Sequence, residues 1–235
     1  MRLRRVSLLC VITAFLALHG VSLAQPTGTS VGNTRRGRLI EGIAFPATGE
    51  GFRFETNRGN LEARYGTPSL VRMLQASIAR VNAAAPGGQL IVEDISNRHG
   101  GTLPGHGSHT SGRDADVRFY AVDASGQPME PRRVSYGPDG RAVDGGPERF
   151  DVERNWLLIE AMLQSREVRV RFIFVAPWIE HLLLAHARPR APRELLRLAE
   201  RRMRPPGTPL ASPHDDHLHV RIGCPAGDVA HGCRP

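Results

Sequence analysis

Two short segments of the chain alternate between polar and apolar residues, as strands with one buried face do. In residues 114–120 the alternation places Asp116 on a polar face. In residues 217–222 it places His217 and His219 together on one face, with apolar residues between them that anchor the strand from behind. Each pattern therefore predicts a strand that presents chemically active side chains on its polar side.

Apolar residues at helical spacing, and continuous apolar runs, predict the remaining elements. Thr67 as N-cap and Pro68 at the first helical position begin one helix, which ends near residues 86–88. Further elements are expected as helices over 151–164, from Pro177 and over about 192–204, and as buried strands over 90–95 and 168–175. Because helices and strands do not alternate strictly, we expect an α+β domain with a small, mainly antiparallel sheet flanked by helices.

The chain divides into three expected parts. Residues 1–24 have a basic start, an apolar run and a small-residue cleavage site, which predicts an export signal peptide. The run is shorter than the roughly 20 residues of a membrane span, so we expect no stable membrane insertion after cleavage; an uncleaved anchor is the alternative. Residues 25–60 show no clear period and are expected to be a loosely structured lead-in, followed by one domain over 61–235.

The net charge of the chain excludes few classes of function, but it favours an anionic binding partner. All 31 basic residues are arginine, and the formal net charge is +8. The arginines look scattered along the chain rather than clustered with aromatic residues, so we expect no nucleic-acid partner. Attraction to an anionic polymer such as the cell wall fits an exported chain better, although a solvated arginine surface is the simpler alternative.

Histidines suggest the chemistry, because five of the ten lie in two windows about a hundred positions apart. The first window contains His106 and His109, and the second contains His214, His217 and His219. A catalytic zinc ion is typically held by three nitrogen or oxygen ligands and keeps a fourth position for water. We expect His109, Asp116 and His219 to form such a set, with His217 beside the open position as the catalytic base or transition-state stabiliser.

The two windows resemble a known family. The blocks GHGSHTSGRDADV and HDDHLHVRIGCP are similar to those of the penicillin-insensitive murein endopeptidases, which are LAS-type zinc metallopeptidases. The resemblance implies the LAS fold shared with hedgehog and D,D-peptidases. It also implies zinc ligands at His109, Asp116 and His219, and an active-site histidine at His217.

The resemblance implies that the chain is a zinc-dependent endopeptidase of the periplasm. Its substrate would be peptidoglycan, cut at the D-Ala to meso-diaminopimelate cross-link, and β-lactams would not inhibit it. One alternative is a D,D- or L,D-carboxypeptidase that trims stem peptides. The other is a non-catalytic, zinc-containing protein that binds the cell wall.

The remaining candidate residues have supporting roles. His106 and His214 are expected to line the pocket or to orient the other side chains of the site. One zinc ion per chain is expected rather than two, because the position that would carry a histidine of the family's second metal group is Ala142. Once Cys10 leaves with the signal, Cys224 and Cys233 remain; we expect a disulfide between them, as in similar proteins.

Overall fold

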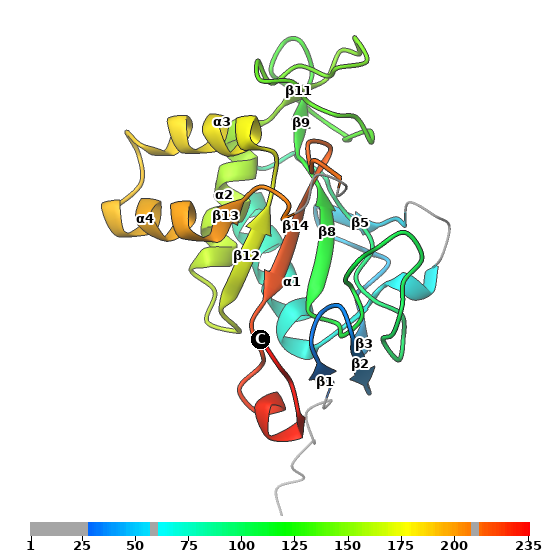
Figure 1. The fold of residues 1–235 in the computed structure, drawn as a ribbon. Coiled ribbons are helices and arrows are strands. Elements are labelled where there is room, and N and C mark those ends of the chain that lie inside the picture. Colours follow the sequence, from blue (N-terminus) through cyan, green and yellow to red (C-terminus); the bar gives the residue numbers. More distant parts are fainter. Residues whose placement is uncertain (1–27, 57–60, 208–211) are drawn as a thin grey trace, which may run out of the picture.

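A seven-stranded sheet crosses the centre of the computed structural model, which describes residues 28–56, 61–207 and 212–235 (Figure 1). The strand order is β13-β12-β14-β8-β7-β5-β4. The strands are β4 (Thr48–Gly49), β5 (Phe52–Phe54), β7 (Leu90–Val92), β8 (Asp114–Arg118), β12 (Val170–Phe174), β13 (Met203–Arg204) and β14 (His217–Ile222). Neighbouring strands are antiparallel except for β12 with β13 and β5 with β7, so the prediction of a mainly antiparallel sheet is confirmed.

The pairing of β8 with β14 brings the two histidine windows together. His219 lies opposite Asp116, and His217 lies opposite Arg118. Between the two histidines, Leu218 is fully buried in the hydrophobic core. Since successive side chains of a strand point to opposite faces, the core lies behind the sheet and the histidines lie on its front.

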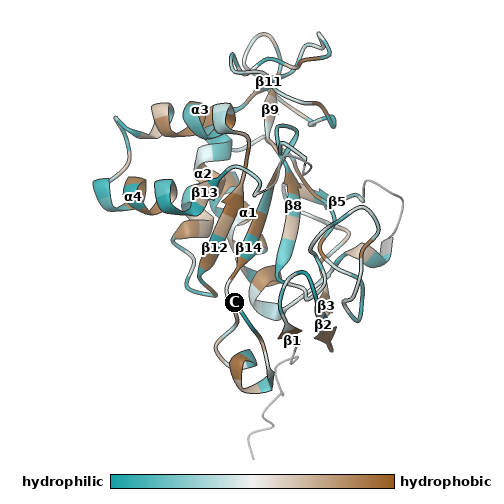
Figure 2. Cartoon of the chain, in the orientation of Figure 1, coloured by the Kyte–Doolittle hydropathy of each residue, from teal (hydrophilic) through white to brown (hydrophobic). Residues whose placement is uncertain are grey.

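Four α-helices of the described residues accompany the sheet, as predicted. Figure 1 shows α1 and α2 behind the central strands, with α3 and α4 beside them. Their bounds are α1 (Pro68–Ala84), α2 (Val152–Leu163), α3 (Pro177–Ala187) and α4 (Arg193–Arg202). The hydroxyl of Thr67 accepts a hydrogen bond from the Leu70 amide at 3.3 Å, which confirms the predicted cap. In Figure 2, α4 carries alternating hydrophilic and hydrophobic bands, as expected of a helix with one solvated face.

Small elements complete the described chain. A three-stranded sheet of order β10-β9-β11 emerges above the main sheet in Figure 1. It consists of β9 (Ala121–Val122), β10 (Pro128–Met129) and β11 (Arg149–Phe150). Elsewhere there are two short 3-10 helices, η1 (Leu61–Ala63) and η2 (Asp228–His231). None of the described helices is long and apolar enough to cross a membrane.

The segment before residue 57 differs from our expectation of a loosely structured lead-in. Its described part forms β1 (Thr29–Gly32), β2 (Gly37–Ile40) and β3 (Ile43–Ala44), and then contributes β4 and β5 to the main sheet. β1 pairs with β2, and β3 pairs with β6 (Tyr65–Gly66). These strands are two to four residues long, which is too short for a hydrophobic period to appear in the sequence. The expected signal peptide, residues 1–24, lies outside the described residues.

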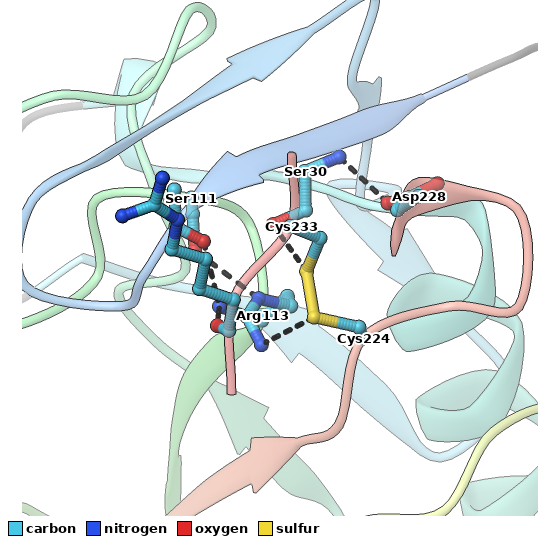
Figure 3. Close-up of a disulfide and its surroundings, with 8 residues drawn as sticks. Ser30, Ser111, Arg113, Cys224, Asp228 and Cys233 are labelled. Carbon is cyan, nitrogen blue, oxygen red and sulfur yellow. Dashed lines mark hydrogen bonds between the residues drawn. A yellow bond between two sulfur atoms is a disulfide. The ribbon is translucent and has the colours of Figure 1, made fainter. Parts of the chain in front are cut away.

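The C-terminal segment is joined to β1 and to the end of β14. Cys224 and Cys233 form the expected disulfide, which indicates an oxidising compartment (Figure 3). The Asp228 carboxylate accepts a hydrogen bond from the Ser30 amide at 2.7 Å. The buried guanidinium of Arg113 donates to the carbonyl oxygens of Gly32 and Arg234, at 3.3 and 2.8 Å.

Reduction of this disulfide should lower the free energy of unfolding by about 2–3 kcal/mol, because the bridge closes a loop of only about ten residues in the unfolded chain. Urea denaturation of the protein with and without reductant measures the change, and the double substitution Cys224→Ser with Cys233→Ser should reproduce it. Two thiols that react with Ellman's reagent in the native, unreduced protein would show that the bridge does not form.

Candidate metal centre

Asp116 lies at the centre of a buried cluster of imidazole rings. Its Oδ1 atom is 3.3 Å from Nε2 of His109, 3.4 Å from Nδ1 of His219 and 3.7 Å from Nε2 of His217. Its Oδ2 atom is 3.5 Å from Nδ1 of His106. The residues predicted from the two windows are therefore side by side, with their ring nitrogens directed at one carboxylate.

The spacing of these atoms suits a tetrahedral metal site. Ligands bound at about 2.0–2.1 Å around a tetrahedral zinc ion lie about 3.3–3.4 Å apart. The pairs that join Asp116 to His109 and to His219 have this separation. Nε2 of His109 and Oδ1 of Asp116 are also buried without a hydrogen-bond partner among the described residues. Buried polar atoms without partners are costly, so a cation between them would satisfy both.

Hydrogen bonds on the far side of each ring fix its orientation. Nδ1 of His109 lies 2.9 Å from the carbonyl oxygen of Ile95, and Nε2 of His219 lies 2.7 Å from Oδ1 of Asp114. Metal-binding histidines usually donate their second ring N–H to a carboxylate or a carbonyl oxygen in this way. These two outer contacts leave Nε2 of His109 and Nδ1 of His219 as the ring atoms that face Asp116.

The loop before β8 holds His109 in an unusual backbone conformation. His109 has a φ of 67°, in the left-handed region that non-glycine residues seldom occupy. Gly112 adopts a similar φ of 68°, and a Cβ there would lie 2.8 Å from the Leu39 side chain and 3.1 Å from the Thr67 amide. The glycine is needed at this close approach, which folds the loop back over the strand and places His109 beside Asp116.

His106 lies at the edge of the same cluster. Its Nε2 is 3.0 Å from Oδ2 of Asp94. The other oxygen of Asp94, Oδ1, accepts a hydrogen bond from the Thr56 hydroxyl. His106, His109 and Asp116 each offer an atom within 4.8 Å of the other two, so this group can also hold a metal ion. His106 is partly exposed, which agrees with its expected place in the pocket wall.

Electrostatics within the metal-free cluster couple the carboxylate to the rings. Burial alone would raise the pKa of Asp116, but His109 and His217 hold it well below its ordinary value. Burial lowers the pKa of His109, yet the Asp116 carboxylate outweighs it and raises the pKa to about 9. Burial also lowers the pKa of His219. A metal ion that binds here must therefore displace a proton from His109, so its affinity will depend on pH.

His217 belongs to a second chain of contacts, which leads away from the metal cluster. Its Nδ1 lies 2.5 Å from Oδ1 of Asp216, and the other oxygen of Asp216 lies 3.4 Å from Nε of Arg133. Arg133 in turn donates to the fully buried carboxylate of Glu93 at 2.9 Å, and Arg118 donates to the other Glu93 oxygen at 2.7 Å. The contacts orient the His217 ring so that Nε2 faces the cluster.

The cluster opens into a groove of about 710 Å³ on the front of the sheet. All six predicted site residues line it. One of them, His214, has a φ of 57° and a buried Nδ1 atom without a hydrogen-bond partner among the described residues. Burial, reinforced by His217 and His219, lowers the pKa of His214 to about 3, so its ring is neutral at ordinary pH.

Three residues of the site were not singled out in the sequence. Asp114 contacts His219, Arg133 lines the groove, and Glu93 anchors Arg133. Asp114 alternates in register with Asp116 on β8, which is a signal that could have identified it. Arg133 and Glu93 come from separate segments with no pattern that relates them to the histidines.

These observations define the class of protein: an α+β domain whose two central strands carry a buried histidine and carboxylate cluster able to hold a metal ion. The family model for penicillin-insensitive murein endopeptidases matches residues 30–235. The chain therefore belongs to the penicillin-insensitive murein endopeptidase family, as the two motif blocks indicated.

Relatives that carry this name are similar over most of the chain. The protein from Haemophilus influenzae is 31% identical over 203 residues, which cover 83% of this chain and 64% of the relative. Proteins from Klebsiella pneumoniae (strain 342) and Escherichia coli (strain SE11) are each 26% identical, over 95% of this chain and 78% of the relative. The chain thus spans less than two thirds of the length of the Haemophilus relative.

Proposed function

We propose that the chain is a zinc-dependent endopeptidase that hydrolyses peptide cross-links of peptidoglycan. The observation that carries this proposal is the arrangement around Oδ1 of Asp116, where two imidazole nitrogens lie at tetrahedral ligand spacing and a third lies just beyond. The family membership supports hydrolysis of a peptide bond in murein. The relatives' names supply the substrate class.

The ligands in this proposal are His109, Asp116 and His219. His106 is the competing candidate, since it too lies within reach of Asp116. However, His106 faces the other carboxylate oxygen of Asp116 and is partly exposed. His109 and His219 face the same oxygen as each other, which favours them as the pair that shares one ion with Asp116.

When bound, zinc would supply a Lewis acid that polarises the scissile carbonyl and makes a water molecule nucleophilic near neutral pH. The proposed role of His217 is to accept a proton from the attacking water, and the geometry supports it because Nε2 faces the cluster while Asp216 holds Nδ1. The Asp216 carboxylate stabilises the protonated ring, and Arg133 holds Asp216 in place. His214 remains neutral beside them and narrows the groove.

Within peptidoglycan, the bond proposed as the target joins D-Ala to meso-diaminopimelate. No serine nucleophile takes part, so β-lactams, which acylate such serines, should leave the activity unchanged. The Cys224–Cys233 disulfide supports an oxidising compartment, and the periplasm is the compartment proposed.

Mass spectrometry of purified cross-linked peptidoglycan, incubated with the mature protein, tests the proposal. We expect dimeric muropeptides to be converted to monomers, and a zinc chelator to stop the conversion until zinc is restored. Trimmed stem peptides with intact cross-links would show a carboxypeptidase instead. Unchanged peptidoglycan in the presence of zinc-loaded protein would refute catalysis and leave a wall-binding protein.

A further inference from the structure

A second groove adjoins the metal cluster along the front of the sheet. It has a volume of about 430 Å³ and shares Arg35 and Arg221 with the groove of the metal cluster. Its floor is Phe172 of β12, which lies opposite Arg221 of β14. Two positions along β12, Phe174 lies opposite His219, and the two rings are 5.2 Å apart between centroids. The second groove therefore begins about 7 Å, or two strand residues, from the proposed zinc ligand.

Arginines that look scattered in the sequence gather around this floor. Here we call the set consisting of Arg35, Arg36, Arg171, Arg204 and Arg221 the arginine surface. Arg35 and Arg36 come from the turn between β1 and β2, whereas Arg171, Arg204 and Arg221 come from three neighbouring strands. The fold thus concentrates positive charge beside the cleft, which the spacing in the sequence did not reveal.

The arginine surface has little internal compensation for its charge. Arg221 is paired with Asp114 at 2.6 Å. Within the described ranges 28–56, 61–207 and 212–235, no ion pair joins the other four to a carboxylate. Arg202 donates to the carbonyl oxygen of Arg171 at 3.5 Å, and burial together with neighbouring arginines, Arg171 and Arg204 among them, lowers its pKa. Such crowding of like charges is relieved when an anion binds.

Two of the guanidinium groups are held in position by an aromatic ring. Cζ of Arg204 lies 3.8 Å from the centroid of the Phe172 ring, and Cζ of Arg171 lies 5.2 Å from it. Stacking restricts an arginine side chain but leaves the N–H groups at its edge free to donate. Paired N–H donors of this kind match the two oxygens of a carboxylate.

We propose that the arginine surface binds the free carboxylates of the stem peptides that flank the cross-link to be cut. The inference rests on the proposed function, because cross-linked stem peptides carry several free carboxylates within a few residues of the scissile bond. An anionic peptide that enters the metal groove would reach Arg171 through the second groove, which shares Arg35 and Arg221 with the first. It would meet Arg204 where that side chain stacks on Phe172. The surface thereby selects an acidic peptide and sets its direction across the site.

The double variant Arg171→Gln with Arg204→Gln tests this inference. Neither side chain contacts the metal cluster, so we expect kcat on cross-linked muropeptides to stay within about twofold. KM should rise roughly five- to tenfold, since each exposed charge pair contributes a fraction of a kcal/mol to about 1 kcal/mol. Arg188→Gln with Arg193→Gln is the matched control. Both arginines are exposed, and replacing them removes the same amount of charge from the α3–α4 region.

Binding without turnover separates this inference from the proposed function. The metal-free protein and both double variants are sedimented with native peptidoglycan sacculi and with sacculi whose carboxylates have been amidated. The Arg171 and Arg204 variant should bind native sacculi more weakly than the control, and this difference should vanish on amidated sacculi. Equal binding of all proteins to native sacculi, or a difference that survives amidation, would overturn the inference. Absence of cross-link cleavage by the wild type would instead refute the proposed function.

Discussion

Replacing His109 with alanine should remove the proposed zinc ion and the proposed endopeptidase activity together. The substitution deletes one of the three proposed ligands, and the buried Asp116 carboxylate loses the His109 ring as an ion-pair partner. Loss of an outer hydrogen-bond partner alone typically lowers metal affinity 10- to 100-fold, so loss of a ligand should lower it more than about 100-fold. Zinc content after dialysis, measured by inductively coupled plasma mass spectrometry, and cleavage of muropeptides give the two readouts.

His181→Ala is the matched control, because His181 is an exposed histidine on α3, far from the cluster in sequence and absent from its groove. Asp116→Ala should behave as His109→Ala does, whereas His106→Ala should keep its zinc. Circular dichroism confirms that each variant is folded. A folded His109→Ala protein with one zinc ion per chain would show that His109 is not a ligand.

His217→Ala should retain zinc and lose turnover. The imidazole touches Asp216 on one side and faces the cluster on the other, so it is placed to move a proton without holding the metal. General acid–base catalysis typically contributes about 10²–10⁴-fold, and kcat should fall by this factor. Steady-state kinetics on a purified dimeric muropeptide, with zinc content measured on the same sample, separates the two effects.

The zinc content of the His217→Ala variant also tests whether His217 is a fourth metal ligand. Its Nε2 is only 3.7 Å from Oδ1 of Asp116, so zinc loss on substitution would mean that His217 binds the metal. An unchanged kcat with full zinc content would remove His217 from the mechanism. Asp216→Asn, which keeps the ring in place but weakens its partner, should give a smaller fall in kcat and no loss of zinc.

The two central strands could be predicted because their chemistry coincides with a local pattern. Alternation in residues 114–120 and 217–222 identified both the face that packs on the core and the face that carries the site. The Thr67–Pro68 start of α1 was equally local, since a cap and a proline act within one turn. In each case the residues that determine the structure lie next to one another in the sequence.

The features that escaped prediction depend on distant partners. The register that sets His219 opposite Asp116 follows from the packing of the whole sheet. The contact between Glu93 and Arg133 joins two segments, and the arginine surface joins four, without any period in common. β1 to β5 are too short to show alternation, and only pairing with neighbours makes them strands.

The junction between β1 and the C-terminal segment has a consequence for how the chain folds. The amide of Gly32 donates to the carbonyl oxygen of Gly232 at 3.0 Å, and Arg234 donates back to Gly32 at 2.9 Å. The Ser30 and Asp228 partners are 198 positions apart. Contacts of such separation form slowly, because a long loop must close before they contribute any stability. The contacts between β1 and residues 228–234 are therefore expected to form late in folding, after the β2 contacts with residues 99–110.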